Sequence, residues 1–241
     1  MRLFTAVYPT EAALAHLDLA LDSVFGGLTV GAGLRWSPRE QRHITLGFHG
    51  EVPEGLVEIY LGSLADLLAD LADSYSTTTA AALFPGNDTR SDQDAQGGRT
   101  SDGSGGFQMA LAGAGVFGGR SLWVGVGEGL APVQQLCRLV NEAAESVGIR
   151  PDQRAGSRPH LTLARACAKL ATRKPRHRKG DPPAWQQPPP DLGLLEGLAH
   201  ALALYQGPTF QVTEVRVVKS TLGAGRSGGS LYETIATIPL P

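Results

Sequence analysis

The sequence predicts strands and helices that alternate in two similar halves, as one large domain or two closely packed lobes. Three observations support this. The chain has 241 residues with 42% hydrophobic content, enough to bury a full core. Apolar residues recur at strand-like and helix-like spacings in turn. The pattern His-x-Thr-Leu begins at His43 and again at His160. No Gly-rich phosphate loop occurs at a strand-helix turn, so a P-loop or dinucleotide-binding fold is not expected.

The first half predicts two strands and two helices. Residues 3–8 have the composition of a strand. A helix follows, with apolar residues on one face and a glycine pair at its end: Leu14, Leu17, Leu21, Val24, Gly26 and Gly27. The strand that begins at His43 comes next. Residues 56–71 are apolar at intervals of three and four, which predicts a second amphipathic helix.

The second half repeats this order and adds strands at its end. Residues 107–115 and 121–126 predict two strands joined by a hairpin at Gly118 and Gly119. The next helix has an apolar face and ends at Gly148; the face comprises Leu130, Val133, Leu136, Cys137 and Val140. The strand from His160 follows. The remaining elements expected are a helix over 192–204 and strands over 210–220 and 232–238.

Two segments differ in composition from the rest. Residues 86–106 are rich in Gly, Ser, Asp and Arg with almost no apolar side chains, so we expect a flexible insertion. Residues 169–190 are first basic and then Pro-rich, which predicts a loop. Its Lys and Arg side chains are either a contact for RNA phosphates or a solvated surface, and the sequence leaves both open.

The two His-x-Thr-Leu copies predict a polar strand face. Side chains alternate along a strand, so His43 and Thr45 should share one face with the small Gly47. The opposite face then carries Ile44, Leu46 and Phe48. Core packing accounts for the apolar positions but not for a polar pair that occurs twice.

The second copy predicts the same arrangement. His160 and Thr162 should share a face with Ala164, while Leu161 and Leu163 are buried. If the fold brings both faces to one gap, two imidazoles and two hydroxyl donors surround it. Such a site is suited to acid and base chemistry on an anion.

The order of these motifs resembles a known family. The chain is similar to the 2H phosphoesterases, and among them to the bacterial RNA 2',3'-cyclic phosphodiesterases, also called 2'-5' RNA ligase-like proteins. The resemblance is carried by residues 2–7, 34–36, 43–50, Phe117, 121–126, 159–165, 215–220 and Tyr232. The segments 77–106 and 166–190 are longer than expected for the family, and Arg42 stands where the family often has a smaller or apolar residue.

The resemblance implies an α+β fold of two pseudo-symmetric lobes. Each lobe would have an antiparallel-rich sheet with helices on its outer face, and the active-site cleft would lie between them. We therefore expect residues 1–241 to form one such domain by internal duplication. The resemblance also implies His43 as proton donor and His160 as proton acceptor, leaving a 2'-phosphate. The residues alone do not order the two histidines.

Opening a cyclic phosphate explains why two histidines would be needed. Water attacks phosphorus in line with the departing ribose oxygen, so a base and an acid act on opposite sides. Imidazoles with pKa values near neutrality can hold opposite protonation states. The hydroxyls of Thr45 and Thr162 would stabilise the non-bridging oxygens.

Four further residues are candidates for binding substrate. Arg165, Ser220 and Tyr232 could contact phosphate or ribose, and Trp36 could stack on a base. Trp36 could equally be a core aromatic residue, and Arg165 a salt-bridge partner. The remaining histidines are expected to be non-catalytic: His16, His49, His177 and His200. This holds for His49 too, although it should share the strand face of His43.

The expected partner is an RNA with a 2',3'-cyclic phosphate end or a small cyclic nucleotide. With a net charge of -2, any RNA affinity requires a local basic patch. We expect no cofactor and no metal, because catalytic zinc usually needs three protein ligands and no such set stands near either motif. We also expect a cytoplasmic protein, since no secretory segment or apolar run of membrane-spanning length occurs. The protein is expected to be a monomer.

Two other functions stay open at this point. The protein could bind RNA ends with weak or no turnover, although both motifs are intact. It could also join RNA ends by a reversible 2'-5' ligation in the same site. No Lys-x-Asp-Gly adenylation motif is present, so energy-driven ligation is not expected.

Overall fold

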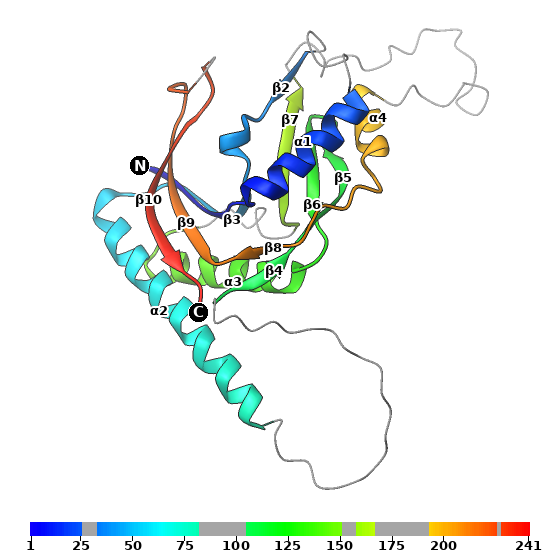
Figure 1. Ribbon diagram of the computed structural model, residues 1–241. Coiled ribbons are helices and arrows are strands. Elements are labelled where there is room, and N and C mark those ends of the chain that lie inside the picture. Colours follow the sequence, from blue (N-terminus) through cyan, green and yellow to red (C-terminus); the bar gives the residue numbers. More distant parts are fainter. Residues whose placement is uncertain (26–32, 82–104, 151–157, 167–192, 226–227) are drawn as a thin grey trace, which may run out of the picture.

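The structure is a computed structural model, shown in Figure 1. It describes residues 1–25, 33–81, 105–150, 158–166, 193–225 and 228–241. The first half contains the strands β1 (Arg2–Val7), β2 (Leu34–Trp36) and β3 (Ile44–Glu51), the helices α1 (Glu11–Phe25) and α2 (Glu54–Ala81), and a short 3-10 helix (Arg39–Gln41).

The second half also alternates strands and helices but begins with three consecutive strands. It contains β4 (Phe107–Met109), β5 (Leu111–Phe117), β6 (Ser121–Val126), α3 (Leu130–Ser146), β7 (His160–Ala166) and α4 (Leu194–Ala201). Three strands end the chain: β8 (Phe210–Val212), β9 (Glu214–Thr221) and β10 (Leu231–Pro239).

Antiparallel pairing organises the molecule. The large sheet has the order β10-β9-β1-β3-β7-β6-β5, with β2 paired to β7, and a small second sheet joins β4 to β8. Every described strand pair is antiparallel. At the centre, β3 and β7 meet through the pair Ile44 and Leu161. These findings confirm the predicted α+β class with antiparallel-rich sheets.

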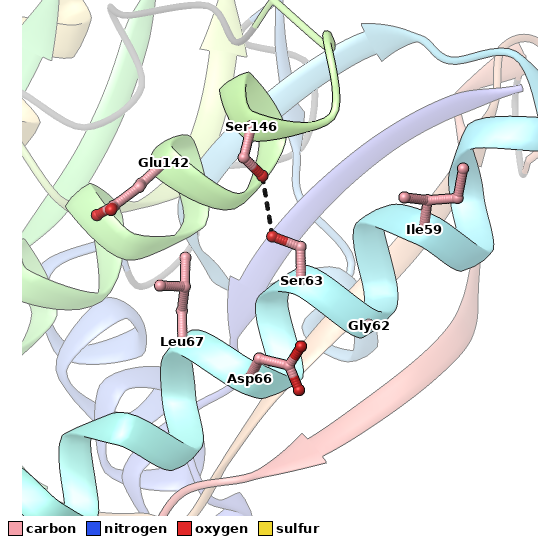
Figure 2. A pocket seen from close by; sticks show the side chains of 7 residues that line it. All are labelled: Ile59, Gly62, Ser63, Asp66, Leu67, Glu142 and Ser146. Carbon is pink, nitrogen blue, oxygen red and sulfur yellow. Dashed lines mark hydrogen bonds between the residues drawn. The ribbon is translucent and has the colours of Figure 1, made fainter.

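The helices bury the apolar faces that their sequences predict. On α1, Leu14, Leu17 and Leu21 are all buried. Helix α3 packs on β3, and α4 packs on β5 and β6 (Figure 1). Helices α2 and α3 lie against each other, and the Ser63 and Ser146 hydroxyls form a 3.0 Å hydrogen bond between them (Figure 2). None of the described helices is long and apolar enough to cross a membrane.

Several elements differ in extent from the predictions. The strand expected over 107–115 is divided at Ala110 into β4 and β5, which join different sheets. The strand expected over 210–220 is similarly divided at Thr213, whose carbonyl accepts from the Leu240 amide. Helix α2 is longer than predicted, α4 is shorter, and β2 had no strand signal of its own. Strand ends and breaks depend on pairing partners, which local patterns do not contain.

The two compositionally distinct segments fall mainly outside the described residues. Of 86–106, only Gly105 and Gly106 are described, and the Gly106 amide donates to the carbonyl of Pro241 at 2.6 Å. The basic and Pro-rich segment 169–190 lies entirely outside. Both expectations about these segments therefore stay predictions.

Candidate active site

The pairing of β3 with β7 brings both His-x-Thr motifs to one cleft. His43 immediately precedes β3 and His160 begins β7. Both histidines, with Thr45 and Thr162, line a cavity of about 1050 Å³. This volume is at the upper end of the range typical of small-ligand sites. The sequence-predicted catalytic group is thus assembled in one place.

A bulge in β3 changes which side chains face this cleft. Thr45 and Gly47 oppose consecutive residues of β1, so Leu46 is an extra residue that interrupts the alternation. Gly47 consequently turns to the buried side with Leu46, and Phe48 turns into the cleft. The prediction that Gly47 shares a face with His43 and that Phe48 lies opposite is therefore wrong.

Strand β7 has a bulge at the corresponding position. Thr162 and Ala164 oppose consecutive residues of β6, so Leu163 is the extra residue. Ala164 is fully buried, and Arg165 lines the cleft. The predicted position of Ala164 beside Thr162 is therefore also wrong, for the same physical reason. The two motifs deviate from regular alternation in the same way.

Close packing of α3 explains why position 47 is small. A Cβ atom on Gly47 would lie 2.6 Å from Cγ1 of Val140 and 3.1 Å from Oδ1 of Asn141. Atoms this close would overlap, so a side chain at this position would displace α3 or β3. The glycine thus provides space for a helix and not, as the sequence suggested, for a ligand.

Both motif histidines are held by the same backbone hydrogen bond. Nδ1 of His43 lies 2.7 Å from the carbonyl oxygen of Gln41, and Nδ1 of His160 lies 2.8 Å from that of Arg158. A carbonyl can only accept, so Nδ1 carries the hydrogen in each ring. In the neutral rings, Nε2 is left as the basic nitrogen.

Aromatic side chains surround His43. Phe4 stacks on its ring with centroids 4.8 Å apart, and the rings of Tyr8 and Tyr232 lie 5.5 and 5.6 Å away. Burial among them lowers the pKa of His43 to about 4. The hydrogen bond to Gln41 acts in the opposite direction. This imidazole is therefore neutral at pH 7, although the sequence suggested a pKa near neutrality.

His160 has a different environment from His43. The ring of Phe117 meets it edge-on at 4.8 Å, and Trp123 lies 6.2 Å away. Burial is the main cause that lowers the pKa of His160, and the positive charge of Arg165 lowers it further. The charges of His160 and Arg165 also lower the pKa of His43. The two imidazoles are therefore electrostatically coupled across the cleft.

The two threonine hydroxyls are available to a ligand. Thr45 and Thr162 line the cleft, and neither hydroxyl forms a hydrogen bond within the described parts of the chain. A hydroxyl can donate to an anionic oxygen while its oxygen accepts from water. The positions are thus compatible with the predicted contact to phosphate.

The four candidate substrate-binding residues all reach the cleft. Arg165, Ser220 and Tyr232 line it together with Trp36. Ser220 is buried, whereas Tyr232 packs on both Phe4 and His43. Trp36 lies opposite the buried Ala164 and packs partly against the main core. Their roles toward substrate stay predictions.

His49 lies away from the cleft, contrary to the sequence interpretation. The bulge in β3 turns it to the helix-covered side, where its Nε2 is 3.0 Å from the Thr5 hydroxyl and 2.9 Å from that of Tyr60. Burial lowers the pKa of His49 to about 4. His16 and His200 are exposed, and His177 lies outside the described residues.

Sequence reasoning missed several residues at the site. Phe4 and Tyr8 contribute rings around His43, Phe48 lines the same cleft, and Arg35 lines it on β2. Phe4 and Tyr8 share a strand face at even spacing, which was a usable signal. Phe48 and Arg35 could not be placed, because a bulge and an unrecognised strand orient them.

Arg42, which departs from the family pattern, has a structural position. Its guanidinium is buried and bonds to the carboxylate of Asp18 on α1, which also pairs with Arg39 at 3.1 Å. This network attaches α1 to the turn that leads into His43. Among the described residues, no group of three or more His, Cys, Asp or Glu is arranged to hold a metal ion.

Comparison with known proteins gives a family match over part of the chain. Residues 18–91, which contain the first motif, match the family described as LigT like phosphoesterase. The resemblance to the 2H phosphoesterases is confirmed. This LigT-like match supports a phosphodiesterase-type enzyme. No curated protein sequence matches the chain significantly.

Solved structures share the fold of this chain. TT0787 of Thermus thermophilus has a TM-score of 0.55 at 22% identity, covering 100% of this chain and 98% of its own. E. coli LigT in apo form has a TM-score of 0.54 at 17% identity, with coverages of 99% and 96%. E. coli LigT complexed with 3'-AMP has a TM-score of 0.51 at 18% identity, with coverages of 99% and 96%.

Proposed function

We propose that this protein hydrolyses 2',3'-cyclic phosphodiester ends of RNA, or of small nucleotides, to 2'-phosphates without a metal ion. The observation that carries the proposal is the convergence of both His-x-Thr motifs on one cleft. In addition, both Nδ1 atoms are bound to carbonyls, which leaves both Nε2 atoms for chemistry. The E. coli LigT complex with 3'-AMP supports a nucleotide as the ligand.

In the proposed reaction, water attacks phosphorus while the bond from phosphorus to the 3' oxygen breaks. Nε2 of His160 accepts the proton of the attacking water. Protonated Nε2 of His43 donates its proton to the departing 3' oxygen. The product is a 2'-phosphate with a free 3'-hydroxyl. The assignment of donor and acceptor follows the family resemblance.

The phosphate itself would create the required protonation state. Burial keeps the pKa of both histidines low. An anion placed between the rings favours the imidazolium form and raises their pKa values. Coupling permits one proton to be shared by the pair, because a second positive charge is disfavoured. Substrate binding thus charges one imidazole while the other stays basic.

The threonines and other side chains that line the cleft would position the substrate. Hydroxyl donors of Thr45 and Thr162 would stabilise the charge that develops on the non-bridging oxygens. Arg165 would add a guanidinium farther along β7 in the same cleft. Tyr232 and Ser220 are suited to ribose contacts, and Trp36 to a base at the cleft edge.

The proposal is tested with an oligonucleotide that ends in a 2',3'-cyclic phosphate, incubated with the protein and a chelator. Identification of the product ends by mass spectrometry should show conversion to the 2'-phosphate. A 5'-hydroxyl oligonucleotide in a parallel reaction would reveal ligation as a joined product. Binding without conversion would instead favour an RNA-end binding protein. Activity that is lost with chelator and restored by a divalent ion would refute the metal-independent mechanism.

A further inference from the structure

Two arginines lie side by side at one end of the cleft. Arg35 on β2 is directly opposite Arg165 on β7, and both side chains are exposed and line the cavity. Neither forms an ion pair with any described residue. Glu40, an acidic side chain at the same cavity, pairs with neither. Like charges directly opposite each other on a sheet are destabilising, so this arrangement lacks a structural benefit of its own.

The arginine pair lies beyond the groups that would hold the reacting phosphate. Arg165 is three residues past Thr162 on the same strand face, which is roughly 10 Å along a strand. Arg35 is opposite Arg165 in the strand register. It therefore also lies past Thr162 along β7, away from His160. Guanidinium groups present planar forks of donors that match phosphate oxygens. The pair therefore has the chemistry to bind an anion other than the reacting one.

We propose that Arg35 and Arg165 form a second phosphate subsite, which binds the phosphate on the 5' oxygen of the nucleoside whose cyclic phosphate lies between the histidines. This inference rests on the proposed function and adds its substrate class. The preferred substrates carry a 5'-phosphate, either as a free monoester or as the link to the preceding nucleotide of an RNA. Nucleosides with a free 5'-hydroxyl are poorer substrates.

Kinetics with three substrates tests the subsite. They are adenosine 2',3'-cyclic phosphate, its 5'-phosphorylated form, and a dinucleotide with the same cyclic end. In the wild type, a phosphate on the 5' oxygen, free or linked, should raise kcat/KM about 10-fold or more relative to adenosine 2',3'-cyclic phosphate. The gain should come from a lower KM, as expected for a charged hydrogen bond that is made equally before and during the reaction. The dinucleotide shows whether the linked phosphate is bound as well as the monoester.

Two variants decide whether Arg35 is responsible. Arg35→Gln should reduce the gain from the 5'-phosphate to less than about 2-fold. Arg120→Gln removes the same charge from the β5–β6 turn, beside the strand position of Arg165 but outside the cleft, and should keep the full gain. Equal losses by Arg35→Gln on all substrates, or no gain in the wild type, would overturn the inference while leaving the proposed function intact.

Binding of product-like ligands separates the two proposals. If no cyclic substrate is turned over, the proposed function fails, but calorimetry with adenosine 2'-monophosphate and adenosine 2',5'-bisphosphate still tests the subsite. The bisphosphate should bind the wild type about 10-fold more tightly, and Arg35→Gln should abolish this difference. Equal affinities of the wild type for both ligands would refute the subsite.

Discussion

His43 and His160 have the same backbone contact but different surroundings. In each, a carbonyl two residues earlier in the chain fixes Nδ1. His43 is enclosed by aromatic rings, one of which stacks on its face, whereas the rings near His160 meet it at steep angles. Burial lowers the pKa of His43 to about 4 and also lowers the pKa of His160, so in the free enzyme neither environment by itself identifies the proton donor.

Removing either imidazole should nearly abolish turnover. His43→Ala and His160→Ala are each expected to lower kcat for a cyclic nucleotide by about 10²- to 10⁴-fold, the range for a positioned acid or base. Thr45→Ala and Thr162→Ala should cost less. His200→Ala, which removes an exposed histidine from α4, is the matched control and should retain full activity. Near-wild-type turnover in either motif variant would contradict the paired mechanism.

The pH dependence of activity should differ between the free and the bound enzyme. Since burial lowers both histidine pKa values, the bell-shaped profile of kcat/KM, which reports the free enzyme, should have its maximum below pH 6.5. The profile of kcat should lie at higher pH, because the bound phosphate raises these pKa values. Steady-state rates with a cyclic mononucleotide between about pH 4.5 and 9 measure both. A kcat/KM maximum above pH 7 would be inconsistent with the buried site.

At the scale of elements, the two bulges determine the composition of the site. The sequence correctly predicted the motif strands, the amphipathic helices and the location of the four motif His and Thr side chains in one cleft, because these follow from periodicity and from a repeated pattern. It misplaced Gly47, Phe48 and His49, since one extra residue reverses the faces of all that follow. It also missed β2, because this strand is specified by its partner β7.

The contact between α3 and β3 can be tested with two glycines. Gly47→Ala should lower the free energy of unfolding by about 1–3 kcal/mol, because the new Cβ would overlap Val140. Gly62→Ala in α2 would place a Cβ with no atom within 4 Å other than those of its chain neighbours and its own helix backbone, and should raise the free energy of unfolding by up to about 1 kcal/mol, from helix propensity. Urea unfolding measures both. A gain of stability in both variants would show that α3 leaves space at Gly47.

At the scale of the whole molecule, the two motif strands have bulges at matching positions, as the predicted internal duplication would produce. Each motif strand pairs with a preceding strand, β1 or β6, and each has one extra residue directly after its threonine. Core packing can produce the same apolar pattern in two strands. It gives less reason for both strands to have a bulge at the same position. An internal duplication, which stays a prediction, would account for a two-histidine site where β3 pairs with β7.

The stability of the whole molecule should decrease in mild acid because histidines are buried without charge. The folded pKa of His49 is about 4, below the value of about 6.5 in an unfolded chain. Between these values the unfolded state binds more protons, so stability is present at higher pH and is lost as pH falls. His49 alone should account for about 3 kcal/mol between pH 7.5 and pH 4.

Urea unfolding of the wild type and His49→Gln at several pH values checks this contribution. Glutamine keeps a hydrogen-bonding group near Thr5 and Tyr60 but cannot be protonated, so the variant should show a shallower loss of stability over the same range. His200→Gln controls for the loss of an exposed histidine and should follow the wild type. Acid sensitivity that is identical in wild type and His49→Gln would mean that His49 is not buried in its neutral form, and that the network with Thr5 and Tyr60 opens before the fold does.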